Sequence, residues 1–140
     1  MNKYVTGFLF NSDNNTVCLI KKNRPLWQKG RLNGVGGHIE EGESPKGAMI
    51  REFWEEAGER NIDWRQFLLV TGSGYELYCF TAKSAGKSLN NIHSVTDEII
   101  GWYPIESLPD NILPNMKWII PMANYELEIT GTIIHESEEC

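Results

Sequence analysis

The stretch SPKGAMIREFWEEAG, residues 44–58, carries the signals of an α-helix at both of its ends. Ser44 is suited to the N-cap, and Pro45 to the first helical position, where the missing N–H group costs nothing. Gly58 stands where a residue in the left-handed conformation ends many helices. The sequence therefore predicts a helix over residues 45–57, and the rest of the fold has to accommodate its two different faces.

These two faces become visible when the side chains are placed at intervals of about 100°. The apolar face, which is expected to meet the core, consists of Met49, Ile50, Phe53, Trp54 and Ala57. The acidic face consists of Glu52, Glu55 and Glu56, with Arg51 and Ala48 beside it. Glu52 therefore meets Glu55 at i+3 and Glu56 at i+4 on the helix surface.

The acidic face opposes the physical chemistry of a helix in two ways. Like charges at i,i+4 cost ~0.2–0.5 kcal/mol per pair, and carboxylates in the last turn cost ~0.3–1 kcal/mol each against the helix dipole. A solvated surface is one explanation, and a site for a hard cation such as Mg²⁺, which prefers oxygen ligands, is the other. The glycine-dense segment before the helix favours the cation site, because it brings backbone groups close to the acidic face.

Segments rich in β-branched and aromatic residues elsewhere predict a sheet. Strands are expected at 3–10 and 16–22, which pair as a hairpin, and at 32–35, 65–73, 75–83, 97–105 and 128–136. A second helix is expected over residues 115–127, although Pro121 is unfavourable inside it. Because strands and helices mix without strict β-α-β alternation, the pattern indicates an α+β fold with a mixed sheet in one domain, residues 1–140.

Composition restricts the partners and the compartment. The net charge is −6, and no run rich in Lys and Arg exists, so duplex nucleic acid is not an expected partner. Cys18, Cys79 and Cys140 form no CxxC pair, which argues against a disulfide scaffold or zinc knuckle and favours a reducing cytoplasm. No run approaches the ~20 apolar residues of a membrane span. Monomer and homodimer both remain open.

One motif of about 23 residues resembles the signature of the Nudix hydrolases. Its polar residues and glycines stand at the required spacing at Gly37, Glu43, Arg51-Glu52, Glu55-Glu56 and Gly58. Phe53 fills the apolar position, whereas Glu59 stands where an apolar residue is usual. The resemblance implies an α/β/α sandwich around a mixed sheet, with Gly37, Glu43 and Gly58 as structural support.

The resemblance also implies a chemistry, in which water attacks phosphorus in a nucleoside diphosphate that is linked to another group. Mg²⁺ or Mn²⁺ is the implied cofactor, with the three carboxylates of the acidic face and the carbonyl of Gly36 as its ligands. Glu52 is in addition the candidate that orients or deprotonates the water. Arg51 is expected to support catalysis by aiming Glu52 through an ion pair with Glu43.

Similar enzymes often supply a further carboxylate from a distant loop, and here Glu98 is the candidate for an extra metal ligand or general base. Asp97 is its rival, and an ordinary acid at a strand edge is the alternative reading. The candidates for binding the substrate are His38 and Arg24 near the phosphates, and Asn33, Asn115 and Trp118 near the base. His38 and Asn33 also have plain readings, as an exposed loop histidine and as a residue that holds the loop.

The expected activity is hydrolysis of a (deoxy)nucleoside triphosphate, oxidised forms included, to a monophosphate and pyrophosphate. The short chain favours an enzyme similar to the MutT-type nucleotide triphosphatases. An ADP-ribose or other nucleoside diphosphate-derivative hydrolase is the alternative enzyme. A nucleotide-sensing module without turnover is the alternative from another class, and the intact set of acids argues against it. RNA cap removal is disfavoured by the missing basic surface.

Overall fold

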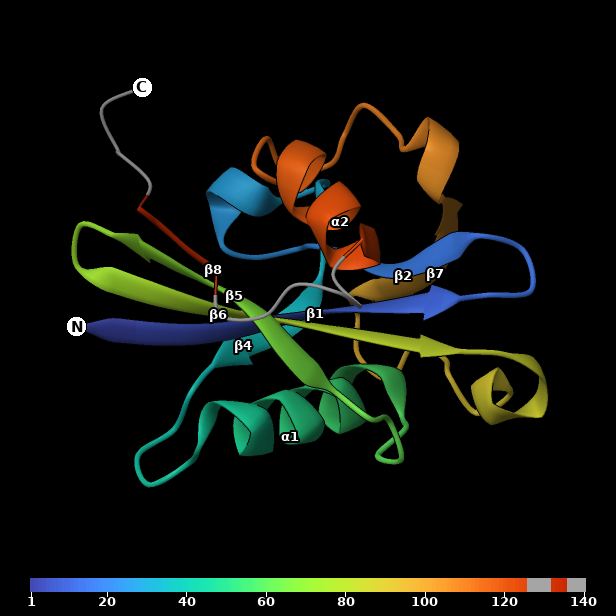
Figure 1. Ribbon diagram of the computed structural model, residues 1–140, viewed down its shortest axis with the longest axis horizontal. Coiled ribbons are helices and arrows are strands. Elements are labelled where there is room, and N and C mark those ends of the chain that lie inside the picture. Colours follow the sequence, from blue (N-terminus) through green and yellow to red (C-terminus); the bar gives the residue numbers. More distant parts are fainter. Residues whose placement is uncertain (126–131, 136–140) are drawn as a thin grey trace.

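The computed structural model describes residues 1–125 and 132–135 (Figure 1). The strands are β1 (Asn2–Asn11), β2 (Thr16–Lys21), β3 (Leu32–Asn33), β4 (Val35–His38), β5 (Arg65–Gly72), β6 (Tyr75–Ser84), β7 (Ile99–Pro104) and β8 (Thr132–His135). The helices are α1 (Pro45–Ala57) and α2 (Met116–Tyr125), with short 3-10 helices η1 (Leu26–Gln28), η2 (Gly86–Leu89) and η3 (Ile105–Ser107). Among the described residues, no helix has the length and hydropathy to span a membrane.

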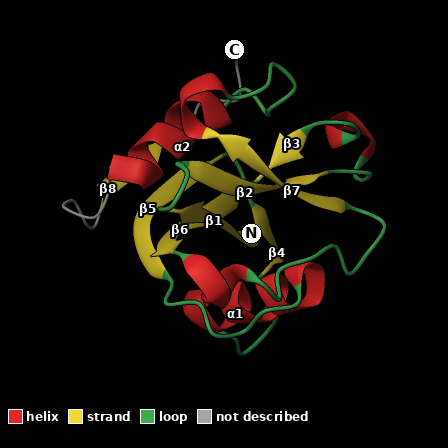
Figure 2. Ribbon diagram, turned by 90° about the vertical axis from the view of Figure 1, so that its right-hand side faces the viewer, coloured by secondary structure: helices red, strands yellow, loops and turns green. Residues whose placement is uncertain are grey.

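The strands form one mixed sheet in the order β3-β2-β1-β6-β5-β8, with β4 paired to β1 and β7 paired to β2. β1 runs parallel to β6, and β5 runs parallel to β8, whereas the other pairs are antiparallel. Helix α1 covers one face of the sheet and α2 covers the opposite face (Figures 1 and 2). This arrangement confirms the predicted α+β class and the α/β/α sandwich. The expected hairpin of the first two strands also forms, with Leu9 opposite Cys18.

A hydrophobic core lies on each face of the sheet, because successive residues of β1 point to opposite sides. Phe8 and Phe10 belong to the core on the α2 side, and Val5 and Leu9 to the core on the α1 side. The buried residues that helix α1 contributes are Ala48, Met49, Phe53 and Ala57. This packing fixes the rotation of α1, so its acidic face is held at the edge of the layer next to β4.

Both predicted ends of helix α1 are present. The Ser44 hydroxyl accepts a hydrogen bond from the Gly47 N–H group at 3.0 Å, and Gly58 has the left-handed φ of 81°. The prediction that Trp54 faces the core is wrong, since its side chain is 44 % exposed and stacks under Arg60. Ala48 is buried instead, so the helix packs on the sheet through Ala48, Met49, Phe53 and Ala57.

The glycine-rich segment and the C-terminal part differ from the expected boundaries. The structure has two short strands, β3 and β4, where one strand over 32–35 was expected, because pairing with β1 overrides the low strand propensity of Gly36 and Gly37. Helix α2 runs through Pro121, which is exposed, although proline has no N–H group to bond the carbonyl one turn earlier. β8 lies inside the expected strand 128–136, and the rest of that range and residues 126–127 lie outside the described residues.

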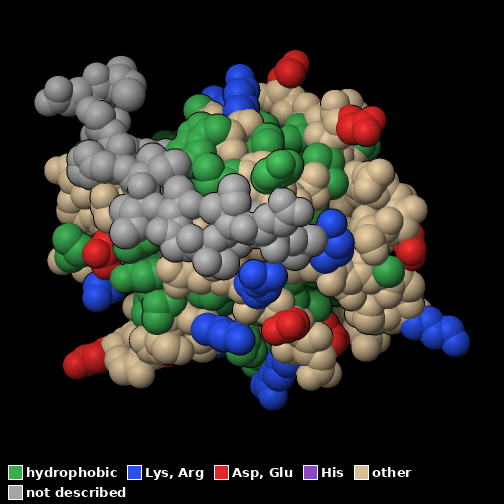
Figure 3. Space-filling model, viewed as in Figure 1, with side chains coloured by type: hydrophobic (Ala, Val, Ile, Leu, Met, Phe, Trp, Pro, Cys, Tyr) green, Lys and Arg blue, Asp and Glu red, His purple; other side chains and the backbone are tan. Residues whose placement is uncertain are grey.

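The surface carries both signs of charge. On the side of the molecule that Figure 3 shows, Lys and Arg side chains lie beside Asp and Glu side chains. In a chain of net charge −6, an anionic ligand therefore needs a local site.

Candidate active site

The guanidinium group of Arg51 fastens the segment before α1 to the helix. Its Nε and Nη2 atoms donate to the two carboxylate oxygens of Glu43 at 2.7 and 2.9 Å, and Nη2 also donates to the His38 carbonyl at 2.9 Å. The predicted ion pair between Arg51 and Glu43 is thus present, in the bidentate geometry that makes such pairs strong. The hydrogen bonds from Arg51 hold the pKa of Glu43 below its ordinary value.

The same arginine also partly neutralises the acidic face. Its Nη1 atom donates to Glu52 Oε1 at 3.0 Å and to the two oxygens of Glu55 at 3.1 and 3.2 Å. These contacts offset the repulsion between the carboxylates in the absence of a metal ion. Among the described residues, no three acidic, histidine or cysteine side chains form a ready metal cluster.

Two glycines of β4 bring the backbone against the acidic face, as the sequence predicts. A Cβ atom on Gly37 would lie 2.6 Å from Glu52 Oε1, and one on Gly36 would collide with the Val5 carbonyl. Neither glycine is among the residues with a positive φ, so the close approach and not the backbone conformation requires them. The Glu52 carboxylate of α1 thus lies directly against the β4 backbone at Gly37.

Glu56 is the carboxylate of the acidic face whose pKa is most perturbed. Burial, followed by the charge of Glu52, raises the pKa of Glu56 to about 8, although the nearby Lys22 ammonium opposes the shift. Its buried Oε2 atom has no hydrogen-bond partner. Burial also raises the pKa of Glu52, against the opposing effect of Arg51. A buried carboxylate oxygen without a partner is costly unless a ligand, water or ion satisfies it, so the donor set fits a hard cation.

Comparison with known proteins decides the family. The model of the NUDIX domain matches residues 2–122. The chain belongs to the Nudix family. It is therefore a pyrophosphohydrolase, and the enzymes of this family generally use a divalent metal ion. A search of the curated proteins finds no match.

Solved structures show the same Nudix fold. The structure of MutT, from a study of Aliivibrio salmonicida and Vibrio cholerae, has a TM-score of 0.69 and 26 % identity, over 85 % of this chain and 92 % of that chain. MutT from Bacillus halodurans has a TM-score of 0.74 and 19 % identity, over 99 % and 92 %. The NUDIX domain of Shewanella oneidensis NrtR, in complex with ADP ribose, has a TM-score of 0.73 and 18 % identity, over 89 % and 87 %.

Glu98 lies at the start of β7 and is only 4 % exposed. Its oxygens accept hydrogen bonds from the Lys22 ammonium at 2.9 Å and from the N–H groups of Asn23 and Arg24 at 2.7 and 3.2 Å. Burial opposes its ionisation, but the bonds from Asn23 and Lys22 outweigh burial and lower its pKa. Its charge contributes to the raised pKa of Glu56, so the two carboxylates are neighbours. Its role as a metal ligand or base stays a prediction.

Lys22 is a residue near the site that the sequence did not predict. Its ammonium group pairs with Glu98 and lies near enough to Glu56 to act on its pKa. A lysine at the end of a strand that precedes a glycine-rich loop is an ordinary sequence feature, and only the pairing of β2 with β7 brings it to the carboxylates. The segment before Glu98 was missed as well, in which the N–H groups of His93 and Val95 donate to the last carbonyls of α1 at 3.1 and 3.3 Å.

Of the two residues predicted to bind the phosphates, His38 ends β4 beside the acidic face, and Arg24 lies beside Glu98. His38 is exposed, and its ring lies 4.5 Å from that of Tyr4, while its carbonyl is bound by Arg51. The Arg24 side chain is 65 % exposed and pairs with Asp97 at 2.7 Å. The plain reading of His38, an exposed histidine, agrees with this position as well as the functional reading does.

The residues predicted to bind the base lie farther along the fold. The Asn33 side chain accepts from the Gly34 N–H group at 2.7 Å and donates to Gln28 at 3.4 Å, so it supports its own loop. Asn115 precedes α2, and Trp118 packs against the core on the α2 side. The sheet therefore separates Asn115 and Trp118 from helix α1.

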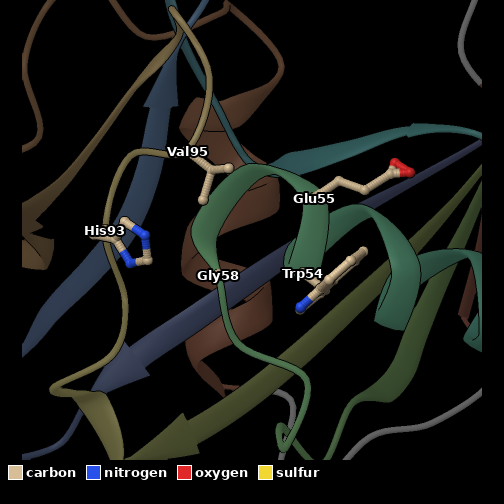
Figure 4. Close-up of a pocket in the computed structure, with 5 residues that line it drawn as sticks. All are labelled: Trp54, Glu55, Gly58, His93 and Val95. Carbon is tan, nitrogen blue, oxygen red and sulfur yellow. The ribbon is translucent and has the colours of Figure 1, made fainter.

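A hollow of about 410 Å³ lies beside the C-terminal end of α1 (Figure 4). It is lined by Trp54, Glu55, Gly58, His93 and Val95. The Glu55 carboxylate points away from His93 and Val95 (Figure 4). Of the acidic face, only Glu55 lines this hollow, whereas Glu52 and Glu56, whose pKa values are raised, do not.

The raised pKa of Glu56 predicts a stability that falls as the pH rises. The unfolded chain releases this proton near the ordinary value of 4.5, whereas the folded chain keeps it to about 8. Without metal, the free energy of unfolding should therefore fall by on the order of 2–4 kcal/mol between these values. Denaturant unfolding of the metal-free protein at about pH 5 and pH 8.5 measures the fall, and Glu56→Gln should remove most of it. An equal fall in both proteins would contradict this assignment.

Proposed function

We propose that this Nudix enzyme hydrolyses a (deoxy)nucleoside triphosphate to a nucleoside monophosphate and pyrophosphate, with Mg²⁺ or Mn²⁺ as its cofactor. The observation that carries the proposal is the buried, unpartnered Oε2 atom of Glu56, which lies on the acidic face beside the glycines of β4. The likeness to a MutT structure at 26 % identity supports a triphosphate as the substrate class.

The metal ligands in this proposal are Glu52, Glu55, Glu56 and the carbonyl of Gly36. A bound divalent ion would screen the polyphosphate and stabilise the charge that develops in the transition state. Glu52 and Glu55 would hold such an ion with carboxylate oxygens that in this structure accept hydrogen bonds from Arg51. Arg51 also forms a bidentate pair with Glu43, which attaches the loop to the helix.

Glu52 orients or deprotonates the attacking water. Its raised pKa, which burial causes, moves this carboxylate toward the range in which a general base is efficient. Gly37 leaves the space that the Glu52 carboxylate occupies, and Gly58 ends the helix directly after the acids. Arg51 and Glu43 act on the reaction by fixing the direction of Glu52.

The proposed substrate contacts are made by residues outside the acidic face. Arg24 and His38 are proposed to bind phosphate oxygens, since a guanidinium and an imidazole can donate to them. Asn33 and Asn115 are proposed to bind the edge of the base, and Trp118 to contact its ring. Of these residues, only His38 lies on an element of the metal site, since it ends the strand β4 that also carries Gly36.

A substrate panel tests the proposal. Release of pyrophosphate and of phosphate is measured for the common and oxidised nucleoside triphosphates and for ADP-ribose, with Mg²⁺, with Mn²⁺ and with a chelator. The proposal expects one or a few triphosphates to give pyrophosphate at the highest kcat/KM, and no turnover with the chelator. A higher kcat/KM for ADP-ribose, or turnover that is independent of metal, would refute it.

A further inference from the structure

The docking segment, residues 91–96 before β7, lies against the C-terminal end of helix α1. As described above, the N–H groups of His93 and Val95 donate to the carbonyls of Ala57 and Glu56, at 3.1 and 3.3 Å. The last four carbonyls of an α-helix have no partner within the helix. The docking segment therefore satisfies two groups that the helix itself leaves unpaired.

The imidazole ring of His93 fills the space next to Gly58. A Cβ atom on Gly58 would lie 2.5 Å from His93 Cε1 and 2.9 Å from Nδ1. The Asn91 carbonyl lies 2.6 Å from Nδ1, and because a carbonyl can only accept, Nδ1 carries the proton in this contact. Figure 4 shows His93 and Val95 on the same segment beside the end of α1. Gly58 thus makes room for this ring, in addition to ending the helix with a left-handed φ of 81°.

The docking segment is also bonded to the start of β7. The Thr96 hydroxyl accepts a hydrogen bond from the Glu98 N–H group at 3.1 Å, and the Ser94 hydroxyl accepts from the Ile100 N–H group at 2.8 Å. The same few residues therefore contact the end of α1 and hold the first residues of β7. A movement of the docking segment away from α1 would carry Glu98 with it.

This connection joins two carboxylates of the candidate site. Glu56 lies in the last turn of α1, and Glu98 follows Val95 by three positions. The charge of Glu98 acts on Glu56, so the two carboxylates are neighbours in space as well. Because a displacement of about 1 Å in an active site can cost a factor of about 100 in rate, the connection between them has consequences for catalysis.

We propose that His93 is a positioning residue, whose ring packs against Gly58, holds the docking segment on α1 and thereby places Glu98 beside Glu56. The inference rests on the proposed function, with Glu98 as the predicted further ligand of the metal ion. His93 is itself exposed, so its replacement should change stability little. Its loss should instead weaken metal binding, which depends on where Glu98 lies.

Amide hydrogen exchange of the metal-free chain tests the docking itself. In His93→Ala, the Val95 N–H group should exchange about tenfold faster, because its bond to α1 opens more often. His93→Phe keeps a ring against Gly58 and should exchange as the wild type does, whereas His93→Asn keeps only a donor for the Asn91 carbonyl and should resemble His93→Ala. The buried Ala48, in the first turn of α1, supplies the control amide, which should be unchanged in all three variants. Unchanged exchange of Val95 in His93→Ala, or exchange in His93→Asn as slow as in the wild type, would overturn the proposal.

Mn²⁺ titration tests the consequence for the site. His93→Ala should weaken Mn²⁺ affinity about tenfold, the scale found when a group that orients a metal ligand is lost, and kcat on the best substrate of the panel should fall in parallel. His93→Phe should restore both, and the matched control Asn90→Ala, exposed directly before the docking segment, should leave both unchanged. Thermal unfolding of the same samples should stay close to that of the wild type.

Faster Val95 exchange together with wild-type Mn²⁺ affinity in His93→Ala would overturn the proposal, because the docking would then not determine the position of Glu98. Neither the exchange nor the Mn²⁺ titration needs a nucleotide. Failure of the triphosphate assignment alone would therefore leave both results standing and would be recognised from the substrate panel.

Discussion

Replacement of Glu52 by glutamine is expected to lower kcat about 100- to 10,000-fold, the range found for a lost general base. The side chain keeps its shape, and the amide oxygen can still accept from Arg51, so the fold is expected to remain. What is lost is the negative charge that the metal ion and the attacking water require. Steady-state kinetics on the best substrate at saturating Mg²⁺ give kcat, and thermal unfolding of the same samples confirms that the variant is folded.

The matched control for this variant is Glu41→Gln. Glu41 is exposed in the loop before α1, outside the acidic face. This control removes the same charge from the same region and should change kcat less than about twofold, since exposed substitutions away from a site have small effects. A folded Glu52→Gln variant with the kcat of the control would remove Glu52 from the mechanism.

Gly37→Ala should have the second largest effect, a loss of kcat on the order of 100-fold, the scale on which a displacement of about 1 Å costs catalysis. The new Cβ atom would lie 2.6 Å from Glu52 Oε1, so the carboxylate must move away from β4. The stability should fall much less than the rate, because the displaced atoms are the end of a flexible side chain. Kinetics and denaturant unfolding of the same preparation separate the two effects.

Gly47→Ala is the corresponding control on helix α1. Gly47 lies in the first turn, and an added Cβ atom would approach only the Ser44 hydroxyl, at 3.1 Å. Alanine is favoured over glycine inside a helix by ~1 kcal/mol, which offsets the small shift that the Ser44 hydroxyl must make, so this variant should be close to the wild type in stability and should keep its kcat. Equal kcat values for the Gly37 and Gly47 variants would show that the position of Glu52 does not limit the reaction.

The elements that the sequence predicted well are those with local signals. Helix α1 begins after Ser44 and ends before Gly58 because capping and the left-handed glycine act within one turn. The hairpin of β1 and β2 follows from strand patterns in the same way. The three-layer arrangement and the ion pair of Arg51 with Glu43 were instead implied by the resemblance to the Nudix signature.

The features that the sequence did not predict depend on contacts between distant segments. Lys22 reaches the acids only because β2 pairs with β7, and the pKa of Glu56 depends on the charges of Lys22 and Glu98, which come from distant segments. Gly36 and Gly37 form a strand because β1 offers them a partner. Trp54 is exposed because α1 packs on the sheet through Ala48, Met49, Phe53 and Ala57. Hydrophobic periodicity alone does not specify which part of a broad apolar face meets the core.

The central claim is that the acidic face of α1 binds a divalent metal ion. Titration of the metal-free protein with Mn²⁺, followed by calorimetry or by the signal of free Mn²⁺ in electron paramagnetic resonance, tests it most directly. We predict at least one bound Mn²⁺ per chain in the wild type and in Glu41→Gln, and affinity weakened about tenfold or more in Glu56→Gln and Glu52→Gln. Absence of Mn²⁺ binding in the wild type, or equal affinity in all four proteins, would contradict the account.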